Sequence, residues 1–263
     1  MSALLSHEQE AAIYRSPDGV EYPAAKVVET LAALSSPERL ERISSVLERR
    51  ITSIALGVED LHHEHNGAAC LRTAEGLGLH RVYAAEVRNP YPHPALGTGP
   101  KESDKKGRIP KGITMHAHRW IQLELFKGTE HKSAGVELVE SAQARGYKVF
   151  GAGPRGKYEL LDLPLDQPLM ILFGNEASGL REDTMAACDG VFKIPMYGFT
   201  ESFNISVSVG MVLEQLGARI RAQLAERGLS GELSDREKLE LTAEWLARDM
   251  RQVDLILRSL IEP

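Results

Sequence analysis

Short, continuous runs of apolar residues, each separated from the next by a helical segment, constrain the fold of this chain more than any other feature. Strand-like runs are expected at 51–59, 81–87, 147–151, 169–173 and 191–195. They do not alternate between polar and apolar residues, as strands with one solvent-facing side do. The pattern therefore predicts an α/β fold whose mostly parallel sheet is flanked by helices on both faces.

Both ends of the chain are expected to be helical extensions. Ser36 and Pro37 predict a helix start, because serine caps helices and proline fits their first position. Residues 234–261 are expected to form one helix with an apolar stripe at heptad spacing: Leu239, Ala243, Leu246, Met250, Val253, Leu257 and Leu260. Such a stripe docks on the parent domain, on a second subunit or on the N-terminal extension, and the sequence leaves all three open.

Composition excludes several classes of protein. With 43% hydrophobic and 26% charged residues, the 263-residue chain has the make-up of a globular protein, not of a disordered or collagen-like one. No apolar run approaches the roughly 18 residues of a membrane helix, and no secretory leader is visible. Cys70 and Cys188 form no CxxC pair, so we expect a reducing, cytoplasmic setting.

The formal charge of −6 by itself argues against a nucleic-acid partner, but it is an average over the whole chain. Residues 88–119 contain seven Lys or Arg against two acids, a local charge of +5. This segment is either a solvated loop with incidental charge or an arm that binds phosphates near the active site.

Three further segments do not resemble ordinary scaffold. The first carries Asn66 and Arg72 on a helix made otherwise of small and apolar residues. An arginine on such a face needs an anionic partner, for which a phosphate or a carboxylate would serve. Four neighbouring residues, 62–65, include three histidines, but adjacent histidines on one loop rarely converge on one ion, and we predict no metal.

The other two segments follow predicted strands. A buried run leads into Gly174, Asn175, Glu176 and Gly179, and glycines after a strand let a ligand approach the backbone closely. Neither GxGxxG nor a Walker A loop is present, which disfavours an unrelated Rossmann dehydrogenase or a nucleotide triphosphate site. A second strand ends near Pro195 and leads into a helix start that carries Ser202 and Asn204.

Taken together, the three segments resemble the SpoU/TrmH branch of the SPOUT superfamily of RNA methyltransferases. The matching residues occur in family order: Asn66 with Arg72 and Thr73; Phe173, Gly174, Asn175 and Glu176 with Gly179 and Leu180; Ile194, Pro195 and Met196 with Gly198, Ser202, Asn204, Ser206 and Ser208. The resemblance covers roughly 36–248 and is nearest to the branch that methylates the ribose of a guanosine in the tRNA D-loop.

The resemblance implies a deep trefoil knot at about 147–216, which ordinary chain topology would not suggest. It also implies S-adenosylmethionine as the cofactor. The expected cofactor-binding residues are Ala152, Gly153, Gly174, Asn175, Ile194, Met196, Phe203 and Ser206. We expect a methyltransferase domain at 36–228 between extensions at 1–35 and 229–263, and a homodimer.

The implied reaction moves a methyl group to a ribose 2′-hydroxyl of RNA, which requires orientation of the reactants and removal of a proton. The resemblance places Arg72 at that hydroxyl as base. Guanidinium groups rarely lose their proton, so holding the phosphate and stabilising the alkoxide is the second role left open. The expected catalytic residues are Arg72, Asn66, Glu176, Ser202 and Asn204.

RNA contacts are expected from one helix-terminal arginine and from the basic segment, namely Arg50, Lys101, Lys105, Lys106, Arg108 and Lys111. Two alternatives to a tRNA methyltransferase remain. One is the same chemistry on ribosomal RNA. The other is a non-catalytic RNA-binding homologue, which the presence of Arg72, Glu176 and Asn204 disfavours.

Overall fold

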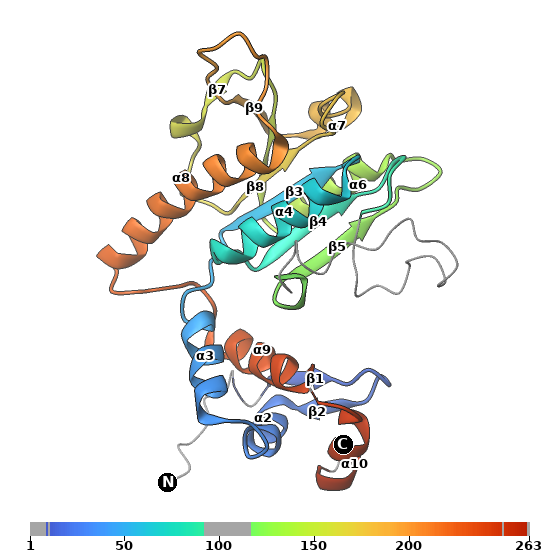
Figure 1. Cartoon of the computed structure of the whole chain (residues 1–263), viewed down its shortest axis with the longest axis vertical. Helices are drawn as coiled ribbons and strands as arrows, with labels where there is room; N and C mark the ends of the chain where they lie inside the picture. Colours follow the sequence, from blue (N-terminus) through green and yellow to red (C-terminus); the bar gives the residue numbers. More distant parts are fainter. Residues whose placement is uncertain (1–8, 10, 92–116, 249, 262–263) are drawn as a thin grey trace. The chain divides into compact units, whose positions relative to one another are not determined.

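The computed structural model describes residues 9, 11–91, 117–248 and 250–261 (Figure 1). Contacts divide the chain into two compact units, which we call the sheet domain (51–227) and the terminal unit (1–50 with 228–263). The first boundary lies at 50/51, whereas the sequence predicted 35/36. The difference arises because the helix at Pro37–Leu47 packs within the terminal unit, against a helix at Asp235–Ala247.

A seven-stranded sheet forms the centre of the sheet domain. Its strands are β3 (Ile54–Glu59), β4 (Arg81–Ala85), β5 (Gln122–Phe126), β6 (Lys148–Ala152), β7 (Tyr158–Glu159), β8 (Leu169–Phe173) and β9 (Gly190–Lys193). Their order is β5-β4-β3-β8-β6-β9-β7, and every neighbouring pair is parallel. The predicted α/β class and parallel sheet are confirmed.

Helices cover both faces of this sheet, as the buried strand pattern requires. They are α4 (Glu64–Gly76), α6 (Ala134–Ala144), α7 (Glu182–Ala187) and α8 (Ile205–Glu226), with short 3-10 turns at Ala117–Arg119 and Leu160–Asp162. Apolar residues of α4 and α8 pack in one core cluster, and those of α6 pack in a second cluster on the opposite face (Figure 1). Every residue of β3 and β8 is buried.

Parallel pairing brings the carboxyl ends of the strands to one edge of the sheet. The loops that leave this edge begin after Glu59 of β3, Ala85 of β4, Phe173 of β8, Ala152 of β6 and Lys193 of β9. Ligand sites of open α/β sheets lie at this edge. All three segments singled out in the sequence begin at or next to it.

In its described residues, the terminal unit combines a two-stranded antiparallel hairpin with the four helices α2, α3, α9 and α10. These elements are β1 (Ile13–Arg15), β2 (Glu21–Pro23), α2 (Ala24–Ala32), α3 (Pro37–Leu47), α9 (Asp235–Ala247) and α10 (Val253–Leu260). Ser36 caps α3 as predicted, since its hydroxyl oxygen accepts a hydrogen bond from the Arg39 amide at 3.3 Å.

The single C-terminal helix predicted over 234–261 is wrong. The chain leaves the helix after Ala247, and Gln252 takes a left-handed φ of 56° before α10 begins. The heptad stripe is therefore interrupted between its third and fifth members. In α9 the buried side chains are Leu241, Ala243, Trp245, Leu246 and Ala247, of which Ala243 and Leu246 belong to that stripe and the other three do not.

Among the described residues, no helix combines the length and the apolar character needed to cross a bilayer.

Candidate functional site

Three of the predicted catalytic residues, Asn66, Glu176 and Asn204, are joined by hydrogen bonds; we call these residues the motif cluster. Asn66 Nδ2 donates to Glu176 Oε1 at 2.8 Å, and Asn204 Nδ2 donates to Asn66 Oδ1 at 3.1 Å. The three residues come from α4, from the loop after β8 and from the N-cap of α8. Each of the three sequence motifs therefore contributes one member.

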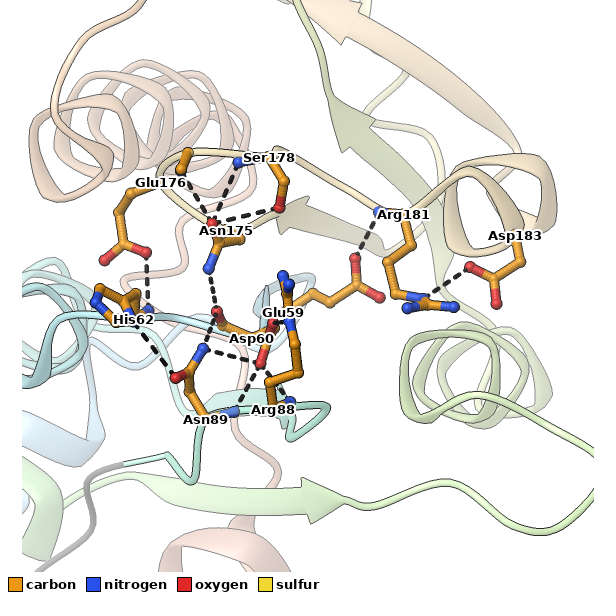
Figure 2. A network of polar contacts seen from close by, with 11 residues as sticks. Glu59, Asp60, His62, Arg88, Asn89, Asn175, Glu176, Ser178, Arg181 and Asp183 are labelled. Carbon is orange, nitrogen blue, oxygen red and sulfur yellow. Dashed lines mark hydrogen bonds and ion pairs between the residues drawn. The ribbon is translucent and has the colours of Figure 1, made fainter.

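Glu176 is the acceptor at one end of the cluster. Its carboxylate also accepts a hydrogen bond from the backbone amide of His62 at 2.8 Å (Figure 2). The backbone amide of His63 donates to the same carboxylate at 3.2 Å. Burial alone would raise the pKa of Glu176, but the hydrogen bonds from Asn66, His62 and His63 hold it below its ordinary value of 4.5. The carboxylate is therefore charged at neutral pH, and its contribution to stability is lost as the pH falls below 4.5.

Asn204 closes the other end of the cluster and caps α8. Its Oδ1 accepts from the Ser206 amide at 2.9 Å and from the Ser206 hydroxyl at 2.6 Å. The side chain of Ser206, expected at the cofactor, thus donates to Asn204.

Two predicted catalytic residues lie outside this cluster. Arg72 is exposed on α4, and Ser202 is exposed before α8. Within the described residues, no hydrogen bond joins either side chain to Asn66, Glu176 or Asn204. Arg72 follows Asn66 by six residues, which is about 1.7 turns of helix, so the two side chains leave different faces of α4.

A second polar group lies beside the motif cluster, and sequence reasoning missed it. Asp60 follows β3 and binds the loop after β4 through Arg88 and Asn89 (Figure 2). Its carbonyl oxygen also accepts from Asn175 Nδ2 at 2.7 Å. A signal was available, because Glu59 and Asp60 end a buried strand at the edge where the motifs lie.

Glu59 is buried and accepts hydrogen bonds from the Thr184 hydroxyl at 2.6 Å and from the Arg181 amide at 2.9 Å. Burial raises the pKa of Glu59, and these two hydrogen bonds offset only part of the rise. The side chain holds Arg181 and Thr184, where the loop that carries Glu176 leads into α7. Its role is structural.

The expected cofactor residues follow β6, β8 and β9, three strands that are neighbours in the sheet. Ala152, Gly153, Gly174, Ile194 and Met196 are half-buried, and Phe203 is 39% exposed. Asn175, which with Ser206 completes the eight expected cofactor residues, has backbone and side-chain atoms that form hydrogen bonds with other residues of the protein. Its backbone pairs with Gly179, and its Oδ1 accepts from the amides of Ala177 and Ser178.

The expectation that Arg50 binds RNA is wrong for this structure. Arg50 is fully buried in the terminal unit, with its guanidinium carbon 5.5 Å from the centre of the Trp245 ring. A cation at this distance from an indole face is attracted to it, and a buried guanidinium presents no charge to a phosphate. The other five expected RNA-binding residues, Lys101, Lys105, Lys106, Arg108 and Lys111, lie outside the described residues.

In the part of the chain that the structure describes, no three His, Cys, Asp or Glu side chains are grouped so that they could hold a metal ion. Cys70 is buried and free, and burial raises its pKa to about 12. The thiol therefore packs as a small apolar side chain beside the site.

Comparisons with known proteins find similar chains among RNA methyltransferases. A tRNA (guanosine(18)-2′-O)-methyltransferase of Borreliella burgdorferi is 29% identical over 197 residues, which are 74% of this chain and 80% of the relative. A 23S rRNA (guanosine-2′-O-)-methyltransferase of a Burkholderia species is 30% identical over 72% of this chain and 66% of the relative.

A crystal structure of the Aquifex aeolicus TrmH/SpoU tRNA modifying enzyme shares the fold, with a TM-score of 0.65 and 24% identity over 82% of this chain and 98% of that chain. The model of the SpoU rRNA methylase family matches residues 53–214, which is most of the sheet domain. This chain therefore belongs to the SpoU rRNA methylase family.

Proposed function

We propose that the protein transfers a methyl group from S-adenosylmethionine to the ribose 2′-hydroxyl of a guanosine in the tRNA D-loop. The observation that carries the proposal is the motif cluster, in which one residue from each of three distant segments meets at the carboxyl edge of the sheet. The relative named for tRNA guanosine 18 supports the substrate. The relative named for 23S rRNA supports ribosomal RNA as the alternative substrate.

The residues at the edge fit an adenosine-containing cofactor. Half-buried glycines, Gly153 and Gly174, follow β6 and β8, and half-buried or exposed apolar side chains follow β9 in the same sheet, a combination that small-molecule sites share. Ile194, Met196 and Phe203 would enclose the base, and backbone groups near Ala152, Gly174 and Met196 would form hydrogen bonds with the cofactor's polar atoms. When bound, S-adenosylmethionine supplies an electrophilic methyl group on a sulfonium centre.

Arg72 is proposed as the residue that acts on the RNA. Its exposed guanidinium would hold the phosphate next to the target ribose and stabilise the oxygen as it loses its proton. The role of base, which the family resemblance also offers, requires a neutral guanidinium and is the less favourable assignment.

The motif cluster would set the geometry in which this chemistry occurs. Glu176 fixes the amide of Asn66, and Asn66 fixes Asn204 at the start of α8. Groups held by two or more hydrogen bonds keep one orientation, which favours reaction between aligned partners. Ser202 is proposed to contact the RNA, because it is exposed and lies close to Asn204 in the sequence.

The remaining expectations are part of the same proposal. The loops after β6, β8 and β9 would form the trefoil knot at about 147–216. Val207 and Met211 are exposed and lie four residues apart on α8, which supports a homodimer through this face. Light scattering of the purified chain measures that state. The setting is proposed to be cytoplasmic, and no metal takes part.

Arg72→Ala tests the assignment most sharply. We expect a fall of about 100- to 1,000-fold in the single-turnover rate of methyl transfer, with unchanged binding of S-adenosylmethionine by calorimetry. Arg227→Ala, which removes an exposed arginine at the far end of α8, is the matched control and should keep the wild-type rate. A near-normal rate for Arg72→Ala would contradict the role given to this residue.

A further inference from the structure

Asp60 has an unusual backbone conformation and a side chain that the proposed mechanism does not use. Its φ is 53°, in the left-handed region that favours glycine, and among the described non-glycine residues only Gln252 shares this feature. A residue with a side chain is strained in this conformation and keeps it only where neighbouring contacts fix it. The contacts of Asp60 therefore indicate which arrangement of loops this strained conformation maintains.

The carboxylate of Asp60 is almost completely buried and receives four hydrogen bonds from two consecutive residues. Arg88 donates its backbone amide at 2.7 Å and its Nε at 3.1 Å. Asn89 donates its backbone amide at 2.8 Å and its Nδ2 at 3.1 Å. Burial would raise the pKa of Asp60, but these hydrogen bonds hold it below the ordinary value.

The backbone of Asp60 connects the same point to two other elements. Its amide donates to the carbonyl of Ala85 at the end of β4, at 2.8 Å. Its carbonyl accepts from Asn175, whose side chain also shapes the loop that carries Glu176 (Figure 2). Asp60 thus joins the loop after β4 to the loop after β8.

Residues 88–91 are the described start of the basic segment (88–119). Tyr91, the last of these residues, is buried and donates its hydroxyl to the carbonyl of Gly67 in α4 at 2.8 Å. The Nδ1 of His62 also lies 3.4 Å from Asn89 Oδ1. The start of the basic segment is therefore held against the same loops that form the motif cluster.

We propose that Asp60 is a positioning residue for RNA binding: it fixes residues 88–91, and with them the origin of the basic segment, against the loop of Asn175 and Glu176. We call Asp60, Arg88, Asn89 and Asn175 the Asp60 clasp. This inference rests on the proposed function, in which the basic segment contacts RNA. It assigns to Arg88 a structural task instead of a phosphate contact.

Asp60→Asn is the most informative substitution. Asparagine tolerates the left-handed conformation. However, it replaces one of the two accepting carboxylate oxygens with an N–H donor, which would face another donor. Asp189→Asn is the matched control, because Asp189 also accepts a backbone amide, Val149 at 2.9 Å, and two side-chain donors, Gln143 and Lys148. That aspartate lies at the opposite, amino edge of the sheet.

Two readouts are measured on the full chain: steady-state kinetics with a tRNA transcript, and amide hydrogen exchange, which needs no substrate. For Asp60→Asn we expect the KM for tRNA to rise about ten-fold, kcat to change less than about three-fold, and exchange at 86–91 to accelerate. Asp189→Asn should change neither. Arg88→Gln, which removes one of the four donors, should give a smaller rise in KM.

The outcomes separate the clasp from the function on which it rests. Faster exchange at 86–91 in a protein that methylates no RNA would support the clasp and overturn the proposed function. Methylation with wild-type KM and exchange in Asp60→Asn would overturn the clasp alone. A fall in kcat with unchanged KM, or the same rise in KM for Asp189→Asn, would also overturn it, because the effect would then concern chemistry or general stability.

Discussion

The sheet domain and the terminal unit use charged residues in different ways. The sheet domain carries twenty Lys or Arg and twenty-one Asp or Glu, whereas the terminal unit carries eleven and sixteen, so the terminal unit holds −5 of the total charge of −6. At the carboxyl edge of the sheet, carboxylates and amides bind one another across loops. In the terminal unit the buried charge is Arg50, which packs on Trp245.

This contrast indicates where the chemistry lies. The family model covers 53–214 and stays within the sheet domain. An acidic surface repels phosphate, so the terminal unit is poorly suited to bind RNA by charge alone. The comparison predicts that substitutions in the two units will separate into effects on stability and effects on methyl transfer.

Trp245→Ala should have the largest effect on stability, and this effect should be limited to the terminal unit. Removing a buried tryptophan costs about 3–5 kcal/mol, and here it also exposes the guanidinium of Arg50. Hydrogen exchange should therefore accelerate in α2, α3 and α9. Binding of S-adenosylmethionine by calorimetry should stay at the wild-type level, and its loss would show that the two units do not behave separately.

Glu176→Gln should reduce methyl transfer without unfolding either unit. The substitution removes the charge that accepts from Asn66, His62 and His63, and hydrogen bonds to a charged group contribute about 1.5–3 kcal/mol. We expect kcat/KM to fall about 10- to 100-fold in an assay with labelled cofactor. Glu182→Gln, on the exposed first turn of α7, serves as control; an equal fall there would contradict a specific role for the motif cluster.

Arg42→Ala should have the smallest effect and is the most direct probe of the acidic unit. Arg42 is exposed on α3, which the sequence marks as rich in arginine. If the terminal unit does not bind RNA by charge, the KM for tRNA should change less than about two-fold. A rise comparable to that expected for Asp60→Asn would mean that this unit contacts the RNA after all.

Much of the sheet domain could be predicted from the sequence because fully buried strands consist of unbroken runs of apolar residues. Both ends of β8, at Leu169 and Phe173, agree with the prediction. The members of the motif cluster could be predicted for a different reason, because residues far apart in the chain match one family pattern. The strand β5 was missed because polar and apolar residues alternate there, with Gln122 before Leu123 and Glu124 before Leu125.

The terminal unit and the Asp60 clasp were not predictable in the same way. Heptad spacing continues past Ala247, but the backbone turns at Gln252, and periodicity does not report a change of φ. Arg50 follows a helix rich in arginine, and only the tertiary structure places Trp245 against it. The Asp60 clasp depends on the left-handed backbone of Asp60 and on its contacts with loops more than twenty positions away in the sequence. No local sequence pattern encodes either feature.

One measurement tests the central claim most directly. Purified protein is incubated with methyl-labelled S-adenosylmethionine and, separately, with total tRNA and with ribosomal RNA, and the labelled nucleosides are mapped by mass spectrometry. The account predicts label in tRNA as 2′-O-methylguanosine within the D-loop. Label only in ribosomal RNA, label on a base in place of the ribose, or no transfer to either RNA would contradict it.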